Sequence, residues 1–127
     1  MNENEISKIV VEKSLKVHKA LGPGLLESVY QGALIYELKK SGLDVVAEKE
    51  IPVIYEGIYF DKGFRADIIV NQKVIIEIKS VRKLEDVHFK QLLTYLKLTN
   101  CKLGLLINFN ESLLKNGLKR VINGTIE

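Results

Sequence analysis

Three charged side chains near the middle of the chain have the types and the spacing needed to hold a cation beside a base. Glu77 and Lys79 are separated by one isoleucine in the apolar segment 74–79, and Asp67 lies ten residues before Glu77. Side chains of an extended strand alternate between its two faces, so Glu77 and Lys79 project from the same face. Carboxylate oxygens are the ligands that Mg²⁺ prefers, and a lysine beside them supplies a point cation.

The polar segment 71–73 decides whether Asp67 joins this face. If it forms a three-residue loop, Val70 pairs with Val74 and Asp67 lies opposite Glu77, with Cβ atoms roughly 5 Å apart. Two carboxylates at that separation repel unless a cation or a proton lies between them. A two-residue loop would turn Glu77 to the other face, because a slip of one residue reverses a strand. We predict the three-residue loop and, with it, a divalent-metal site.

The same register places Arg65 opposite Lys79. Like charges that face each other across two strands are unfavourable. A bend in the strand would separate them, or both could serve an anion such as a phosphate. Acids and lysines that alternate along a strand are also typical of a solvated face, so this segment alone leaves a metal site and a solvated face equally open.

A fourth acid, Glu27, falls in the first turn of a helix predicted over residues 25–40. An acid is favoured at a helix start by the helix dipole alone. The alternative is that Glu27 belongs to the acidic site.

A third helix, beginning at residue 84 or 86 and ending at 98, carries His88, Gln91 and Tyr95 at helical spacing between apolar neighbours. Such a stripe fits a helix face that borders a site, and it also fits a partly exposed helix. His88 is a poor metal ligand, because the other histidine, His18, lies on a different helix.

The surrounding pattern predicts an α/β fold in which helices flank a mixed β-sheet. A first helix over 4–21 would bury Ile6, Val10, Val17 and Leu21, and the helix over 25–40 would bury Leu26, Tyr30, Ala33 and Leu38. Strands are expected at 48–55, at 58–70 with a bend at 61–63, at 74–79, at 103–109 and, more weakly, at 117–122. The run 103–109 is nearly all apolar, which is typical of a strand buried on both faces.

Length and composition predict one domain over residues 1–127, without a signal peptide or a membrane span, in the cytoplasm. The single cysteine, Cys101, excludes an internal disulfide and is expected to be buried. A net charge of +3 is too small to indicate a nucleic-acid partner by itself.

Taken together, these segments resemble the GxxExxY family of the PD-(D/E)XK nuclease superfamily over nearly the whole chain. The naming motif stands as Gly24-Leu25-Leu26-Glu27-Ser28-Val29-Tyr30. The further matching segments are Phe64-Arg65-Ala66-Asp67, Ile76-Glu77-Ile78-Lys79, His88 to Leu96 and Gly104 to Phe109. In one departure, Ala66 stands where the superfamily name has proline.

The resemblance implies a restriction-endonuclease-like α/β/α core and metal-dependent phosphodiester hydrolysis. It implies that Mg²⁺ or Mn²⁺ is bound by Glu27, Asp67, Glu77 and the carbonyl of Ile78, and that Lys79 orients or polarises the attacking water. The residues expected to bind substrate or support the site are Tyr30, Arg65, His88, Gln91 and Tyr95.

Three functions follow as alternatives. The first is a nuclease acting on DNA in preference to RNA, and the second is a weakly active or inactive nucleic-acid-binding or accessory protein with the same fold. The third is a protein-interaction domain whose carboxylates are structural. A homodimer or a larger protein partner would supply surface that so small a chain lacks.

Overall fold

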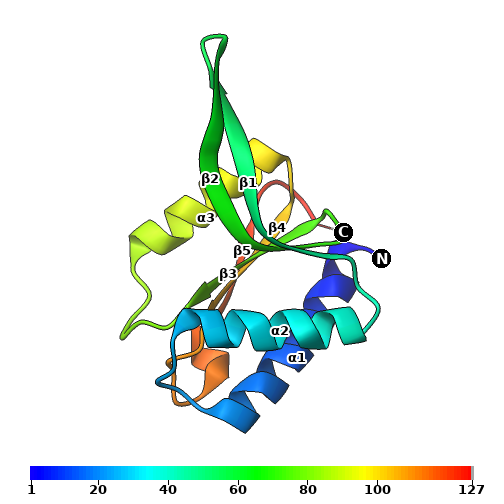
Figure 1. Cartoon of the computed structure of the whole chain (residues 1–127), viewed down its shortest axis with the longest axis vertical. Helices are drawn as coiled ribbons and strands as arrows, with labels where there is room; N and C mark the ends of the chain where they lie inside the picture. Colours follow the sequence, from blue (N-terminus) through cyan, green and yellow to red (C-terminus); the bar gives the residue numbers. More distant parts are fainter. Residues whose placement is uncertain (127) are drawn as a thin grey trace.

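The structure, a computed structural model, describes residues 1–126. Three α-helices, five strands and one short 3-10 helix follow one another in the described part (Figure 1). In chain order they are α1 (Glu3–Leu21), α2 (Glu27–Lys40), β1 (Val45–Tyr55), β2 (Ile58–Val70), β3 (Val74–Lys79), α3 (Asp86–Thr99), β4 (Leu103–Asn108), η1 (Leu114–Gly117) and β5 (Leu118–Ile122).

The strands form a mixed sheet in the order β1-β2-β3-β4-β5. Neighbours are antiparallel except β3 and β4, which are parallel and are connected through α3. A parallel pair needs such a crossover connection, whereas antiparallel neighbours can be joined by short turns. The predicted α/β fold with a mixed sheet is confirmed.

Two apolar clusters fill the two faces of the sheet. Val74, Ile76 and Ile78 of β3 pack with α1 and α2, whereas Ile75 packs in the cluster that contains Leu92 of α3. This division confirms the predicted alternation along β3. It places Glu77 and Lys79 on the α3 side, and the four central residues of β3 and all of β4 are buried on both faces.

The first helix begins with a capping box, in which the Asn2 side chain accepts from the Glu5 backbone nitrogen and Glu5 accepts from that of Asn2. Its predicted buried face is confirmed for Ile6, Val10 and Val17 but is wrong for Leu21, which is 41% exposed. Leu21 is the last helical residue, so it lies beyond the part of α1 that packs on the sheet.

The second helix begins at Glu27, two residues later than predicted. Leu26 is its N-cap in an extended conformation and is 76% exposed, so its predicted burial is wrong. Gly24 has a φ of 99°, a value that favours glycine, and the turn it forms points the following leucines away from the core.

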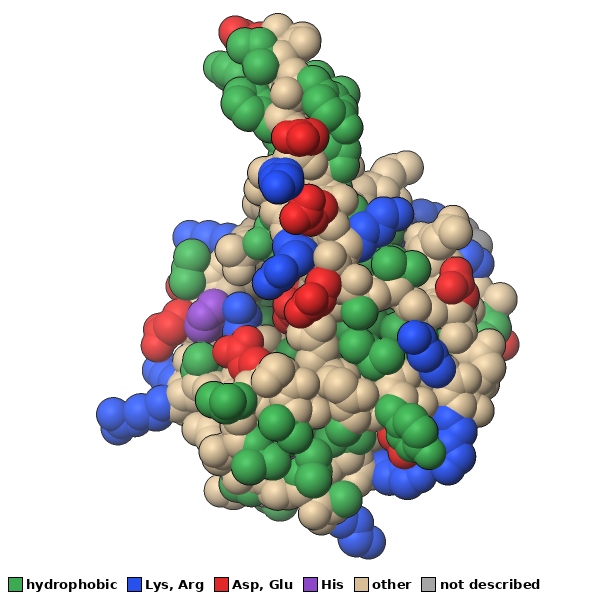
Figure 2. All heavy atoms as spheres, viewed as in Figure 1, with side chains coloured by type: hydrophobic (Ala, Val, Ile, Leu, Met, Phe, Trp, Pro, Cys, Tyr) green, Lys and Arg blue, Asp and Glu red, His purple; other side chains and the backbone are tan. Residues whose placement is uncertain are grey.

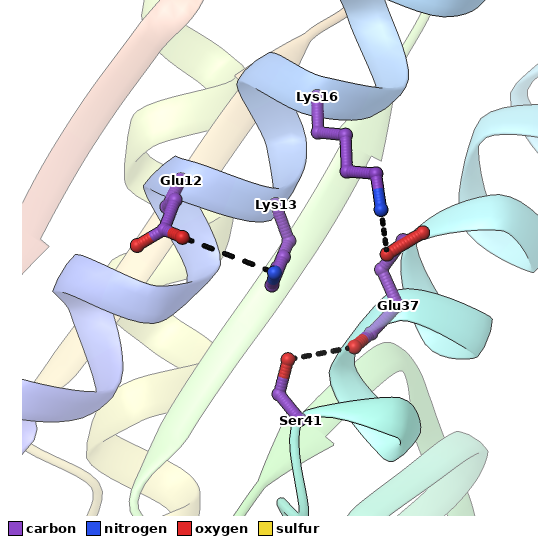
Figure 3. A network of polar contacts seen from close by, with 5 residues as sticks. All are labelled: Glu12, Lys13, Lys16, Glu37 and Ser41. Carbon is purple, nitrogen blue, oxygen red and sulfur yellow. Dashed lines mark hydrogen bonds and ion pairs between the residues drawn. The ribbon is translucent and has the colours of Figure 1, made fainter.

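A buried carboxylate joins α2 to α1 (Figure 3). Lys16 Nζ donates to Glu37 Oε1 at 2.9 Å, although Glu37 is only 8% exposed. The Lys16 ammonium, as the largest influence, lowers the pKa of the Glu37 carboxyl. This ion pair contributes to holding α2 against α1.

The β1–β2 hairpin projects beyond the rest of the molecule as a two-stranded arm (Figure 1). The pairing register shifts between Ile51 and Val53, opposite the segment where a bend at 61–63 was predicted. A Cβ atom on Gly63 would lie 2.2 Å from Val53 Cγ2, so the two strands approach too closely there for a side chain. No helix among the described residues is long and apolar enough to cross a membrane.

Candidate active site

The loop over 71–73 sets the register between β2 and β3. Val70 pairs with Val74 and Ile68 with Ile76, so the predicted three-residue loop is confirmed. Asn71 and Gln72 have φ angles of 50° and 57°, as expected for a tight hairpin turn.

Beyond Ile68 the two strands stop pairing, and side chains of Asp67 and Glu77 take over the hydrogen bonds of the ladder. The Asp67 backbone nitrogen donates to Glu77 Oε2 at 2.9 Å. The Ile78 backbone nitrogen donates to Asp67 Oδ2 at 2.8 Å. Each carboxylate therefore binds the backbone of the opposite strand, which holds both side chains in the gap between β2 and β3.

The alternation of β2 is interrupted at this point. Ala66 and Ile69 both pack on the α3 side, although they are three residues apart. Glu48, which lies across from Asp67 in β1, has a φ of 51°. Bulge-like irregularities of this kind redirect side chains, and here the irregularity coincides with the acidic pair.

Burial and mutual repulsion disfavour the ionised forms of the acidic pair. Burial, then the Asp67 charge, raises the pKa of Glu77 to about 8. Burial also raises the pKa of Asp67, while the Ile78 N–H and the Lys79 charge act in the opposite direction and the Glu27 charge adds to the rise. Glu77 is 6% exposed, so little water is available to screen this repulsion.

Lys79 is partly buried at the end of β3. Its positive charge lowers the pKa of both carboxyl groups, yet no ion pair within 4.0 Å joins it to either in the described structure. The ammonium is therefore close enough to act on the site electrostatically without being held by the acids.

Glu27 is exposed at the first turn of α2, and its charge reaches Asp67. Across residues 1–126, no three His, Cys, Asp or Glu side chains are already gathered in a way that could hold a metal ion. The acidic site thus consists of a close pair, Asp67 and Glu77, with Glu27 nearby.

The polar stripe of α3 borders this pair. Burial, followed by the charges of Glu77 and Asp67, raises the pKa of the Tyr95 hydroxyl, to which Gln91 is hydrogen-bonded. The Tyr95 ring stacks on Phe64 with centroids 3.9 Å apart. His88 has a local role instead, because its Nδ1 accepts from the Glu85 backbone nitrogen at the start of α3.

Arg65 does not lie opposite Lys79, and that expectation is wrong. Its cross-strand partner is Glu50 of β1, because β2 has already separated from β3 where Arg65 occurs. The unfavourable pairing of like charges is thereby avoided, and the Arg65 side chain is exposed.

Tyr30 is fully buried and supports the turn before α2. Its hydroxyl donates to the Gly22 carbonyl at 2.5 Å and accepts from the Leu25 backbone nitrogen at 3.1 Å. Its ring stacks on Phe109 with centroids 4.6 Å apart. The first turn of α2 therefore carries both an exposed acid, Glu27, and the buried residue, Tyr30, that supports the preceding turn.

Three supporting residues were not predicted. Gln31 donates to the Asp67 carbonyl at 3.4 Å, and Ser80 Oγ donates to the Leu25 carbonyl at 2.7 Å. Asn108, fully buried, accepts from the Val81 nitrogen and donates to the Val81 carbonyl. Of these three residues, only Asn108 could have been noticed in the sequence, because it is the one polar residue of the apolar run 103–109.

The fold and the site define a class of protein, an α/β protein with an acidic pair and a lysine where two central strands diverge. The family model of the PD-(D/E)XK nuclease superfamily matches residues 4–121, and the chain belongs to that superfamily. Comparisons with curated proteins and with solved structures gave no match.

Proposed function

We propose that this chain is a metal-dependent nuclease of the GxxExxY family that hydrolyses phosphodiester bonds in DNA. The observation that supports this most is the acidic pair, a buried Glu77 and a partly buried Asp67, next to a lysine with which neither forms an ion pair. Burying two like charges is unfavourable unless a cation or a proton compensates them. A structural role alone would be served better by neutral side chains.

The oxygens present fit a hard divalent cation such as Mg²⁺ or Mn²⁺. Mg²⁺ is commonly bound by one or two carboxylates and several waters, so Asp67 and Glu77 suffice as its core ligands. The Ile78 N–H faces β2, and the carbonyl of the same residue in an extended strand faces the same side. Rotation of the exposed Glu27 side chain would add a further carboxylate.

When bound, the cation would lower the pKa of a coordinated water and stabilise charge on the phosphoryl oxygens. Lys79 would orient the attacking water or stabilise the same developing charge. Gln91 and Tyr95 would present polar groups to the substrate from α3, and the exposed Arg65 would bind a phosphate of the DNA backbone.

The direct test is cleavage of labelled single-stranded, duplex and branched DNA and RNA with Mg²⁺ or Mn²⁺. We expect Lys79→Ala to reduce cleavage roughly a hundred-fold or more, because one lost transition-state contact commonly has that effect. Lys8→Ala, which removes an exposed lysine of α1, is the matched control and should retain full activity. Equal activity of Lys79→Ala and the wild type would refute the catalytic role.

A second candidate, a weakly active or inactive accessory protein, is favoured by one observation. Among residues 1–126 no third acid joins Asp67 and Glu77 in a group that could hold a metal ion, because Glu27 affects Asp67 only through its charge. Calorimetry with Mn²⁺ on the wild type and on Glu77→Gln distinguishes the nuclease from the accessory protein when it is combined with the cleavage assay. Binding that depends on Glu77 without cleavage of any substrate would support the accessory protein, and no binding even with a DNA oligomer present would contradict both.

A further inference from the structure

The projecting arm of β1 and β2 has an apolar tip that the rest of the described chain leaves exposed. Ile54 pairs with Tyr59 and Tyr55 with Ile58, so successive pairs point to opposite faces of the ribbon. The five large apolar side chains of the tip, which include Phe60, are 49% to 68% exposed. They gather at the end of the arm in the space-filling view (Figure 2).

The tip exposes a large apolar surface on its two faces. Three of its side chains are aromatic, and a buried aromatic side chain typically contributes ~150–250 Å². The tip therefore offers on the order of 500 Å² of apolar surface, close to the largest patch found on an ordinary monomer.

The charges of the arm favour a protein partner over a nucleic acid. Between residues 48 and 65 there are four acidic and three basic side chains, so this segment is net negative. Nucleic-acid affinity depends on basic groups that neutralise phosphates, and the acids here would oppose it. Glu56 lies at the turn of the arm itself.

An apolar groove lies at the base of the same arm, on the α3 side of the sheet. It has a volume of about 450 Å³ and is lined by Val46, Ile51 and Leu98 among others. Val46 and Leu98 are 37% and 45% exposed. The basic residue Lys49 also lines it, so the groove matches the tip in both apolar character and charge.

We propose that this chain forms a two-fold dimer in which the arm tip of each copy occupies the arm-base groove of the other. Tyr55 and Ile58 fill the groove, and Glu56 lies beside Lys49 of the second copy. Two-fold symmetry makes both contacts at once, because two arms that run side by side in opposite directions bring each tip to the other base.

The contact uses side chains and does not extend the sheet. β1 is an edge strand, but Pro52 lies within it and has no N–H to donate. Tyr55 and Ile58 of each tip and the apolar lining of each groove supply the surface that this contact would bury. The dimer brings two acidic sites into one particle, which provides more surface to bind a duplex.

The test is sedimentation of the full chain at concentrations up to roughly 100 μM, well above the dissociation constant of an ordinary interface. We expect a dimer for the wild type and a monomer for Ile58→Asp, since a buried unpaired carboxylate is strongly unfavourable. The tip is exposed in the single chain, so the melting temperature of the Ile58→Asp monomer should differ little from that of diluted wild type.

A charge exchange tests which surfaces meet. Glu56→Lys alone and Lys49→Glu alone should each weaken the dimer about ten-fold, because both contacts then oppose like charges. A mixture of the two variants should regain wild-type affinity, since both contacts of the mixed dimer are attractive. Glu12→Lys, an equal charge change on α1, is the control.

Three results would overturn the proposal: a wild-type chain that remains monomeric, a mixture that does not regain affinity, or a wild-type dimer that Ile58→Asp leaves intact. A monomer whose DNA affinity falls with Ile58→Asp would assign the arm to nucleic acid instead. Sedimentation needs no cleavage, so its result is independent of whether the acidic site is catalytic.

Discussion

Asp67 and Glu77 each accept a hydrogen bond from the backbone of the other's strand. Asp67 accepts from the Ile78 nitrogen at 2.8 Å, and Glu77 accepts from the nitrogen of Asp67 itself at 2.9 Å. Side-chain oxygens thus replace main-chain carbonyls at the point where β2 and β3 separate. The fold therefore holds two acids together although their ionised forms repel.

This pair makes stability depend on pH when divalent cations are removed. The pKa of Glu77 is about 8 in the folded chain against an ordinary value of 4.5. The folded protein therefore binds more protons than the unfolded chain between these values, and the stabilisation present below pH 4.5 is lost as the pH rises through about 8. The loss should be on the order of 5 kcal/mol, because the two pKa values differ by about 3.5 and one pKa unit corresponds to ~1.4 kcal/mol.

Urea denaturation from pH 5 to pH 8.5 in a chelator measures this effect, with Glu77→Gln as the comparison. The glutamine can still accept from the Asp67 nitrogen but does not titrate, so the slope with pH should become much shallower. Mg²⁺ at pH 8 should stabilise the wild type and leave the variant nearly unchanged. Parallel pH profiles for the two proteins would contradict the assignment.

Tyr30→Phe tests the support of the turn before α2. The substitution keeps the stacking on Phe109 and removes the hydroxyl that joins Gly22 to Leu25. The free energy of unfolding should fall by about 1–2 kcal/mol, because a partly buried carbonyl and a backbone N–H lose their partner. Thermal melting measures it. Tyr36→Phe, at a position 63% exposed, is the control and should have no measurable effect.

Asn108→Ala tests how the segment after Lys79 is held. The Asn108 amide satisfies both backbone groups of Val81, and its removal should decrease stability by roughly 2–3 kcal/mol. Hydrogen exchange at the Val81 amide should become faster. Asn108→Asp keeps an acceptor for the Val81 nitrogen but loses the donor to the Val81 carbonyl. A smaller increase in the exchange rate of the Val81 amide is therefore expected. Unchanged protection in both variants would show that other contacts hold this segment.

Glu37→Gln tests the ion pair between α1 and α2. Because Lys16 lowers the pKa of Glu37, the ion pair stabilises the protein above pH 4.5 and loses its effect as the pH falls through the lower folded value. The variant should therefore be less stable than the wild type at pH 7 and equal to it in strong acid. The effect should be small and weakened by salt, since Lys16 is half exposed.

Glu12→Gln is the matched control for that substitution. Glu12 and Lys13 form a longer pair of 3.8 Å near the surface of α1 (Figure 3). Exposed pairs of this kind contribute little, so denaturation midpoints should not change. A larger effect for Glu12→Gln than for Glu37→Gln would contradict the importance of the interhelical pair.

The sequence pattern alone predicted the position of a side chain correctly where that position depends only on the residue's own strand or turn. Strand alternation predicted that Ile76 and Glu77 face opposite sides, and the 71–73 loop predicted the register that brings Asp67 to Glu77. These features are set by a period of two residues and by turn length, which the sequence displays directly.

Only the tertiary structure decided features that depend on distant segments. Before Ile68, β2 is no longer paired with β3 but is still paired with β1, and this keeps Arg65 away from Lys79. The exposure of Leu26 follows from the turn at Gly24, and the role of Asn108 follows from its contact with Val81. The sequence alone determined which residues could share a face. The packing of helices on both sides of the sheet decided how deeply the acidic pair is buried, and thereby the pKa of Glu77.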